Sequence, residues 1–360
     1  MGRIAKILYA ASTMEHINNF HLEIIDALRD RGDGVIVMAR GVGADFDIPF
    51  EKRLSSLVNI KIIFKIRKIL KRERFDTLIL NTTLAAFLIR VALPKRLKKT
   101  TKVINFVHGY LFSPKCGVLK RTFFLLCEKL VCKKCDTVIT MNSYDEYMAK
   151  RYRLARERVI GTRGVGIRRR GVITPPERIR EELGLSEGLV ITFVGELSRR
   201  KNQAFLIRCL PKIRERLGEV RLCLVGEGGE RERLLRLAER LSVADAVIFT
   251  GYRADAMDFI RLCDLYASAS LVEGMPLNVI EAMSIGKTVL ASRIKGHTDL
   301  IADGDDGYLY EIGDEGEFVD LACRILSGEL PGNGRGKKVP DGYDRSSAAA
   351  SILKILTDGA

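Results

Sequence analysis

Two series of short apolar runs, separated by longer segments with helical periodicity, dominate this sequence. We expect strands of a first series at 4–10, 35–39, 77–80, 103–107 and 137–140, and of a second at 189–194, 221–225, 246–250, 265–269 and 288–291. We expect helices at 17–28, 60–74, 119–134, 202–216, 230–241, 255–262, 277–285 and 346–356. Strands that alternate with helices predict an α/β fold with a doubly wound parallel sheet in each series.

Chain length and the break between the series predict two domains. A chain of 360 residues, 47% of them hydrophobic, is long enough to bury two cores. The segment 163–178 is rich in Gly, Pro and Arg and is typical of a linker. We therefore expect domains at 1–168 and 169–340, and a C-terminal segment 341–360 whose helix packs back toward the first domain. Because ligands of open α/β sheets bind beyond the carboxyl ends of the strands, a cleft is expected between the two domains.

The charge of the chain is concentrated in its first half. Residues 1–170 hold 35 Lys and Arg against 15 Asp and Glu, whereas the remainder holds 25 against 30, so the halves carry +20 and −5 of the net +15. This asymmetry indicates a polyanion or an anionic membrane surface as a partner, with a merely solvated basic surface as an equal alternative. On the expected helix 60–74, Ile62, Ile66, Ile69 and Leu70 form one apolar stripe. We favour a helix that covers the sheet over one that lies on an anionic leaflet.

Two further patterns concern the compartment. The sequence has no run of about 18 apolar residues, so no membrane-spanning helix is expected and membrane contact would be peripheral. Eight scattered cysteines are typical of buried thiols in a reduced cytosolic protein. Cys132 and Cys135 form a CxxC pair that would share one helix face, but no second pair completes a zinc site.

The segment 264–292, DLYASASLVEGMPLNVIEAMSIGKTVLAS, has the clearest chemical pattern. Pro276 suits the first turn of a helix, whose free amides and dipole favour a phosphate. Glu273 and Glu281 would flank this anion site, where carboxylates can accept hydrogen bonds from ribose and sugar hydroxyls. From these residues alone, a plainer interpretation is slightly favoured over a ligand site formed by both carboxylates. In that interpretation Glu281 is an ordinary helix glutamate and Glu273 an ordinary charged loop residue.

Several motifs resemble one enzyme family. EGMPLNVIEAM resembles the E-x7-E signature of glycosyltransferase family four, and the downstream IKGHTDLIADGDDGYLY resembles the block that follows it. HINNFHLEII, VHGYLF, GVGI and VGELSRRKN add further matches, so the resemblance covers roughly residues 4–311 and is more specific in the C-terminal half than in the N-terminal half. It is closest to the capsular and exopolysaccharide branch. It implies a retaining enzyme of GT-B fold, with two Rossmann-like domains that face a central cleft. The first domain would bind the acceptor and the second the nucleotide-sugar donor.

The resemblance implies a role for the basic turn at VGELSRRKN. Lys201 matches the family lysine that contacts the donor diphosphate. After Gly195, also expected in the donor site, the family often has an arginine, but this chain has Glu196. Arg199 and Arg200 are therefore the expected substitutes for the second phosphate contact, with a solvated helix start as the plainer alternative.

The same resemblance assigns the carboxylates and their loop. Glu281 matches the residue that binds ribose hydroxyls, and Glu273 the residue that orients the transferred sugar near its anomeric carbon. The loop amides would hold the sugar and phosphate, at Gly274, Met275 and Leu277. Neither carboxylate is expected to be a simple nucleophile, because the family mechanism is viewed as front-face attack with help from the donor phosphate.

The four histidines receive different expectations. His108 matches the family histidine beside the donor sugar and is expected to be catalytic. His16 matches a histidine near the acceptor side and is expected to bind the acceptor, with a purely structural role as the alternative. His21 is expected to be a packed helix residue. His297 lies in a block that lines the donor side in relatives, with a direct role as the weaker alternative.

Together these expectations describe a cytoplasmic enzyme that acts peripherally at the inner face of the membrane. It would transfer a sugar from a nucleotide-sugar donor, UDP-linked in most relatives, to a glycan or lipid-linked acceptor in cell-surface polysaccharide biosynthesis. No cofactor and no metal are expected, because no DxD motif follows a strand in the manner of metal-dependent transferases. A GT-B sugar-nucleotide epimerase is the alternative. A nucleic-acid-binding protein that uses the basic half is the second alternative, but no nucleic-acid motif supports it, and no nucleic-acid partner is expected.

Overall fold

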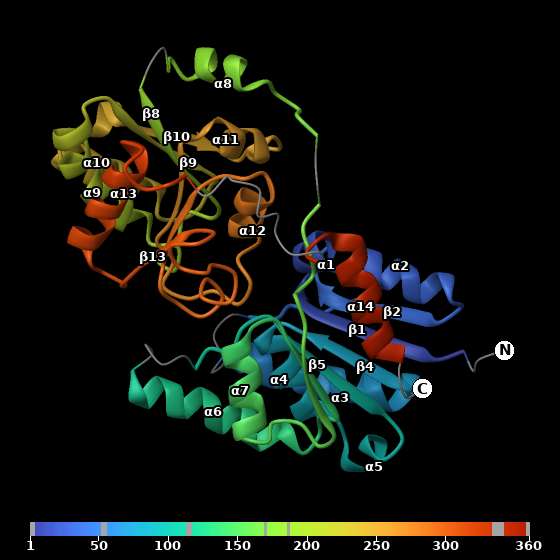
Figure 1. Cartoon of the computed structure of the whole chain (residues 1–360). Helices are drawn as coiled ribbons and strands as arrows, with labels where there is room; N and C mark the ends of the chain where they lie inside the picture. Colours follow the sequence, from blue (N-terminus) through green and yellow to red (C-terminus); the bar gives the residue numbers. More distant parts are fainter. Residues whose placement is uncertain are drawn as a thin grey trace. The chain divides into compact units, whose positions relative to one another are not determined.

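The chain forms two compact units (Figure 1). The computed structural model describes residues 4–51, 56–112, 117–168, 171–185, 188–332 and 342–357. Unit 1 contains the chain up to Gly166 together with the C-terminal helix, and unit 2 runs from Ile167 to Asp344. From the sequence, we expect the boundary between the two domains after residue 168 and a C-terminal segment that begins at residue 341.

In the described part of unit 1, a parallel sheet has the order β3-β2-β1-β4-β5-β6-β7. Its strands are β1 (Lys6–Thr13), β2 (Gly34–Arg40), β3 (Phe46–Asp47), β4 (Thr77–Asn81), β5 (Lys102–Val107), β6 (Thr137–Thr140) and β7 (Arg158–Gly161). Most of their residues are buried, as expected for parallel strands covered on both faces. The strand order reverses between β1 and β4, and this is the place where doubly wound sheets bind ligands.

Helices cover both faces of this sheet. They are α1 (Met14–Phe20), α2 (Leu22–Asp30), α3 (Leu57–Glu73), α4 (Thr83–Ala92), α5 (Lys95–Lys98), α6 (Val118–Cys132), α7 (Ser143–Arg151) and α14 (Arg345–Thr357). The apolar stripe of α3, from Ile62 to Leu70, is buried in the core with α4, which confirms that α3 covers the sheet. Helix α14 packs against α2, so the C-terminal helix belongs to unit 1 (Figure 1).

Unit 2 repeats the doubly wound arrangement. Its described sheet has the order β10-β9-β8-β11-β12-β13, with neighbouring strands parallel. The strands are β8 (Leu189–Val194), β9 (Val220–Val225), β10 (Val247–Gly251), β11 (Leu265–Ser268), β12 (Val289–Ser292) and β13 (Tyr308–Tyr310). The helices are α8 (Pro176–Glu182), α9 (Gln203–Leu217), α10 (Arg231–Arg240), α11 (Ala256–Leu262), α12 (Leu277–Ser284) and α13 (Glu315–Leu326). One core lies under α9, α10 and α13 and a second under α8, α11 and α12, so the two-domain α/β prediction is confirmed.

The structure corrects several predicted elements. The helix expected at 17–28 is two helices, because the backbone leaves helical geometry at His21, whose φ is −128° and whose side chain turns inward to Tyr9. Helix α4 was not expected from the sequence. None of its residues is exposed, so it has no solvent-facing polar side of the kind that marks a surface helix. Strands β3 and β13 are too short to give a sequence pattern.

Two findings bear on the compartment expectations. No helix among the described residues has the length and apolar character needed to cross a bilayer. The described cysteines are free thiols. We expected Cys132 and Cys135 to share one helix face, but α6 ends at Cys132 and Cys135 is buried beyond the end of the helix. Burial raises the pKa of the Cys135 thiol to about 12, which makes it unreactive at neutral pH.

Candidate functional site

The loops that leave β8 and β11 meet where the strand order of unit 2 reverses. Gly195 follows β8 with a φ of +147°, and a Cβ there would lie 3.2 Å from the Phe193 ring and 3.7 Å from Lys201 Cε. A Cβ at Gly226 would overlap the carbonyl oxygen of Gly195, so two backbones pass here in direct contact. Glycine is required at both positions. The close packing fixes the turn from Gly195 to Lys201 against the strand ends.

Glu273, on the loop after β11, is held by two cations of that turn. Its Oε1 lies 2.7 Å from Lys201 Nζ, and its Oε2 lies 3.0 Å from Arg200 Nη1. Glu273 is only 6% exposed, whereas the Arg200 side chain remains half-exposed. The backbone supports the contact, because Leu271 donates its N–H to the carbonyl oxygen of Arg200 at 2.8 Å. A buried carboxylate and two cations therefore lie together beyond the carboxyl ends of β8 and β11.

The electrostatics keep Glu273 ionised. Burial acts to raise the pKa of its carboxyl, but the charges of Lys201 and Arg200 outweigh burial and lower the pKa to about 2. At neutral pH Glu273 is thus a carboxylate that accepts hydrogen bonds, and it has no proton to donate as a general acid.

His297 supports this loop from inside the unit. It is fully buried, and its Nδ1 lies 2.7 Å from the carbonyl oxygen of Ser292. A carbonyl oxygen only accepts, so Nδ1 carries the proton and Nε2 accepts from the Ser268 hydroxyl at 3.3 Å. Burial lowers the pKa of His297 to about 4, although the Glu273 charge acts in the opposite direction. The neighbouring Gly296 has a φ of +88° and would contact the Glu273 loop if it carried a Cβ.

Helix α12 continues the site from this loop. Asn278 in its first turn donates to the carbonyl oxygen of Val194 at 2.7 Å and so fixes the helix start to the end of β8. Gly274 and Met275 lie half-buried on the loop before the helix, and Leu277 is its first residue. Glu281 lies one turn beyond Asn278 and is half-buried. Burial raises the pKa of the Tyr266 phenol on β11, and the charge of Glu281 acts in the same direction.

Arg199 and Arg200, the two candidates for the second phosphate contact, lie in different surroundings. Arg199 is 82% exposed and pairs with Glu230 at 3.2 Å. It lines a separate hollow of about 310 Å³ beside α9 and α10, together with Arg208 and Arg233. Arg200, its neighbour in sequence, faces Glu273 instead. Of the two residues, only Arg200 contacts the buried carboxylate, a distinction that depends on the conformation of the turn and has no signature in the sequence.

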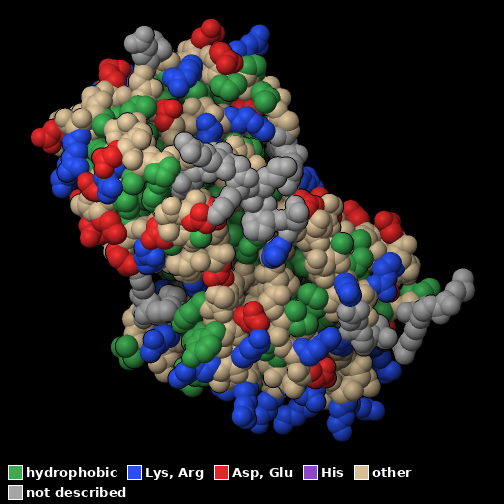
Figure 2. Space-filling view, viewed as in Figure 1, with side chains coloured by type: hydrophobic (Ala, Val, Ile, Leu, Met, Phe, Trp, Pro, Cys, Tyr) green, Lys and Arg blue, Asp and Glu red, His purple; other side chains and the backbone are tan. Residues whose placement is uncertain are grey.

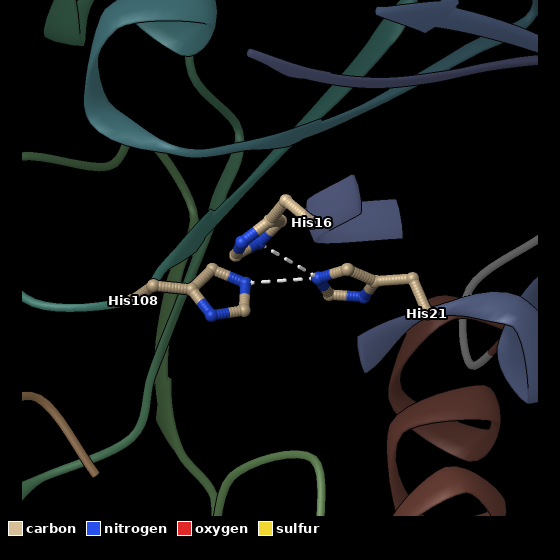
Figure 3. Close-up of side chains that lie close together, drawn as sticks. All are labelled: His16, His21 and His108. Carbon is tan, nitrogen blue, oxygen red and sulfur yellow. Dashed lines mark hydrogen bonds between the residues drawn. The ribbon is translucent and has the colours of Figure 1, made fainter. Parts of the chain in front are cut away.

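Unit 1 brings three histidines together at the carboxyl ends of its strands (Figure 3). His16 lies on α1 after β1, His21 lies between α1 and α2, and His108 directly follows β5. His21 Nε2 is 3.3 Å from His16 Nε2 and 3.1 Å from His108 Nε2. His21 is buried, as expected of a packed residue, but it contacts both of the other rings. The sequence did not reveal this cluster, because residues five positions apart do not share a helix face and His108 is remote in the chain.

Burial also controls the charge of these histidines. It lowers the pKa of His16 to about 4 and holds those of His21 and His108 well below the usual range, with mutual repulsion between the rings as a second cause at His21 and His108. At neutral pH the three imidazoles are neutral. Each therefore has one N–H and one lone pair for a ligand.

Solved structures share the fold of this chain. A crystal structure of Anabaena Alr3699/HepE in complex with UDP matches with a TM-score of 0.77, at 20% identity over 98% of this chain and 100% of that chain. A crystal structure of WaaG, a glycosyltransferase involved in lipopolysaccharide biosynthesis, matches with a TM-score of 0.76, at 18% identity over 98% of this chain and 100% of that chain. The fold is that of the GT-B glycosyltransferases.

Sequence comparison leads to the family. The model of Glycosyltransferase Family 4 matches residues 17–160, and the model of Glycosyl transferases group 1 matches residues 176–337. The putative glycosyltransferase EpsD of Bacillus subtilis (strain 168) is 29% identical over 325 residues, 87% of this chain and 85% of that protein. The UDP-Gal:alpha-D-GlcNAc-diphosphoundecaprenol alpha-1,3-galactosyltransferase of Escherichia coli is 25% identical over 78% of this chain and 73% of that protein. This chain belongs to glycosyltransferase family four, as its motifs predicted.

Proposed function

We propose that this protein is a retaining glycosyltransferase that uses a UDP-linked sugar donor and a glycan or lipid-linked acceptor in cell-surface polysaccharide biosynthesis. The observation that carries the proposal is the buried Glu273 carboxylate, held by Lys201 and Arg200 beyond the carboxyl ends of β8 and β11 in unit 2. The names of two relatives support it. One relative transfers galactose from a UDP donor to a diphosphoundecaprenol-linked sugar, and another was solved with UDP and glucose.

In this proposal the donor diphosphate replaces Glu273 as the binding partner of Lys201 and Arg200. Lys201 and Arg200 move from Glu273 to the phosphate oxygens, because both groups form strong charge-assisted hydrogen bonds to phosphate. The carboxylate that they release then accepts hydrogen bonds from the hydroxyls of the transferred sugar. Glu281 binds the ribose hydroxyls from α12. Backbone N–H groups complete the donor site, at Gly274, Met275 and Leu277. Gly195 contributes a close backbone approach instead, because its own N–H is donated to the carbonyl oxygen of Val225 at 2.8 Å.

Transfer then proceeds on one face of the sugar. The bond from the anomeric carbon to the diphosphate oxygen breaks, and the acceptor hydroxyl oxygen forms the new bond on the same face. The acceptor proton passes to the departing phosphate, and the nucleoside diphosphate leaves. Lys201 and Arg200 stabilise the negative charge on the leaving group, so the proposal includes no metal and no cofactor for this step. His108 positions the donor sugar and His16 the acceptor.

A panel of nucleotide sugars tests the donor site by thermal shift, on the wild-type chain and on Glu281→Ala. We expect at least one UDP-sugar to raise the melting temperature of the wild type, since a ligand that binds only the folded state stabilises it by about 2.7 kcal/mol at one hundred times its Kd. The Glu281→Ala variant should lose this response. If no nucleotide sugar stabilises the wild type, or if the variant responds equally, the donor-site assignment is wrong.

Turnover without an acceptor separates the proposal from its alternative. An epimerase would convert or hydrolyse the nucleotide sugar in the absence of any acceptor, whereas a transferase would release UDP at a substantial rate only when a lipid-linked glycan is supplied. Fast acceptor-free conversion of the sugar would favour the epimerase.

We further propose that unit 1 contacts an anionic membrane through one face of α6. Leu119, Phe123, Leu126 and Leu130 follow one another at intervals of four, three and four residues, and each is more than half exposed. Exposed basic side chains flank this stripe, at Lys120, Arg121, Lys129 and Lys133. Lys and Arg side chains also gather at the end of unit 1 where Figure 1 labels α5 (Figure 2). An apolar helix face bordered by cations fits an anionic leaflet that presents a lipid-linked acceptor.

A further inference from the structure

Three of the four histidines of the chain direct the same ring nitrogen to one point in unit 1 (Figure 3). His21 Nε2 lies 3.1 Å from His108 Nε2 and 3.3 Å from His16 Nε2, and the ligand atoms of all three rings lie within 4.8 Å of one another. His16 and His108 are 92 residues apart in the sequence, so the tertiary fold creates the cluster and a local turn does not.

Hydrogen bonds among the rings do not satisfy this arrangement. A neutral imidazole nitrogen has either one N–H or one in-plane lone pair. His21 Nε2 faces two partner nitrogens, so it can form one linear hydrogen bond and leaves the second close contact without one. A single cation at the centre would instead accept a lone pair from every ring.

The spacing agrees with a coordination site. Zinc binds histidine nitrogen at about 2.0–2.1 Å with tetrahedral geometry, which separates two ligand nitrogens by about 3.3 Å. The separations of His21 Nε2 from the Nε2 atoms of His108 and His16, 3.1 and 3.3 Å, are close to this value. Three neutral imidazoles are ligands that suit zinc and its first-row neighbours, and catalytic zinc sites use three protein ligands and an open fourth position.

Tyr9 orients the central ligand. Its hydroxyl lies 2.8 Å from His21 Nδ1 inside the core. When Nδ1 donates its proton to the phenol oxygen, the lone pair of His21 is fixed on Nε2 and points toward the other two rings. A hydrogen bond of this kind to the second nitrogen of a metal-binding histidine is a usual feature of such sites. His16 and His108 keep some exposure, which leaves a path from solvent to the cluster.

We propose that His16, His21 and His108 form a binding site for Zn²⁺, with their three Nε2 atoms as ligands and a fourth position open to solvent or substrate. The sequence predicts no metal because no DxD motif follows a strand as it does in metal-dependent transferases, whereas the histidine cluster arises only in the tertiary fold. The proposal goes beyond the proposed function, because zinc binding is measured without donor or acceptor. Where both proposals hold, zinc occupies two rings assigned to the sugars and competes with them.

The test uses the full chain with a tag that contains no histidine, stripped with a chelator and titrated with Zn²⁺ against a chromophoric chelator. We expect one tight site per chain. Loading with Co²⁺ should give the intense visible bands of a four-coordinate ion. His16→Ala and His108→Ala should each weaken zinc binding more than about 100-fold, beyond the usual cost of changing a supporting residue, and Tyr9→Phe should weaken it about tenfold.

Two control variants separate this site from other zinc ligands. His297→Gln removes the fourth histidine, which lies in unit 2, and Cys132→Ser removes a half-buried thiol, so both should bind zinc as the wild type does. If His21→Ala does not fold, His16→Ala carries the test because His16 is only half-buried. The proposal is overturned if the wild type binds zinc no better than His16→Ala, or if Cys132→Ser abolishes binding.

Discussion

Lys201 Nζ and Glu273 Oε1 lie 2.7 Å apart, and both side chains are almost completely buried. Desolvation makes such a pair costly, and its mutual attraction offsets that cost only while both charges are present. The pair also explains how Glu273 can be ready to bind sugar hydroxyls. Lys201 holds the Glu273 carboxylate in the ligand-free protein, and Lys201 is also the cation that we propose for the donor diphosphate. Stability and donor binding should therefore change together at this position.

Lys201→Met tests this coupling. The methionine keeps the apolar stem but leaves a buried carboxylate with Arg200 alone, so we expect the free energy of unfolding to fall by about 2–4 kcal/mol. The affinity for UDP should fall at least about tenfold, since hydrogen bonds to charged groups contribute about 1.5–3 kcal/mol. Urea denaturation and UDP titration measure the two effects.

Arg199→Met is the matched control for Lys201→Met. Arg199 belongs to the same basic turn, but it is 82% exposed and pairs with Glu230. Both stability and UDP affinity should stay close to those of the wild type, because exposed ion pairs contribute little. If both variants lost stability and UDP affinity equally, the general positive charge of this turn, and not the buried Lys201–Glu273 pair, would determine both properties.

The pH dependence of stability should show Glu273 directly. Its pKa is lowered to about 2 in the folded chain, from an ordinary value near 4.5, so the unfolded state takes up its proton first as pH falls. The stabilisation is present above about pH 4.5 and is lost toward pH 2. The difference in unfolding free energy between wild type and Glu273→Gln should therefore be constant from pH 7 to 5 and decrease below pH 4.5. A difference that stays constant down to pH 3 would contradict the lowered pKa.

His297 should affect a different pH range. Burial lowers its pKa to about 4 from an ordinary 6.5, so below pH 6.5 the unfolded state binds a proton that the folded state still excludes. Stability contributed by the neutral ring is complete above pH 6.5 and is lost as pH falls toward 4. Wild type should lose stability between pH 6.5 and 4.5 more steeply than His297→Gln, as measured by urea denaturation. Parallel curves would show that His297 titrates normally.

The limits of sequence reasoning are visible at particular residues. The alternation of strands and helices predicted both sheets, because buried parallel strands are continuous apolar runs whose signal is local. The E-x7-E motif, which identified Glu273 and Glu281 as candidates, is likewise a local signal because both residues lie within nine positions of the sequence. By contrast, the partner of Arg200 depends on the turn that ends at Asn202, which has the left-handed φ of 57°. The histidine cluster depends on a helix break at His21 and on β5, so only tertiary structure brings it together.

A buried ion pair should hold the inner face of α6. Arg90 on α4 forms two hydrogen bonds with Glu128, at 2.9 and 3.0 Å, and both side chains are almost completely buried. Glu128→Ala leaves the guanidinium without its carboxylate, so we expect a loss of about 3–5 kcal/mol in unfolding free energy. Hydrogen exchange should increase over α6 in particular. Lys120→Ala, on the exposed face of the same helix, is the control and should change neither measurement.

The exposed stripe of α6 should determine binding to anionic vesicles. Phe123 and Leu126 are 52% and 57% exposed, so replacing both with serine removes apolar surface without disturbing the core. Cosedimentation with vesicles of phosphatidylglycerol should weaken at least about tenfold, because interfacial binding scales with buried apolar area. The matched control is Phe64→Ser on α3, where the phenylalanine is 65% exposed beside basic residues but the helix buries its own apolar stripe. Binding should also weaken in high salt, since the flanking cations attract the anionic surface. A loss in Phe64→Ser with full binding by the α6 variant would assign the membrane contact to α3 instead.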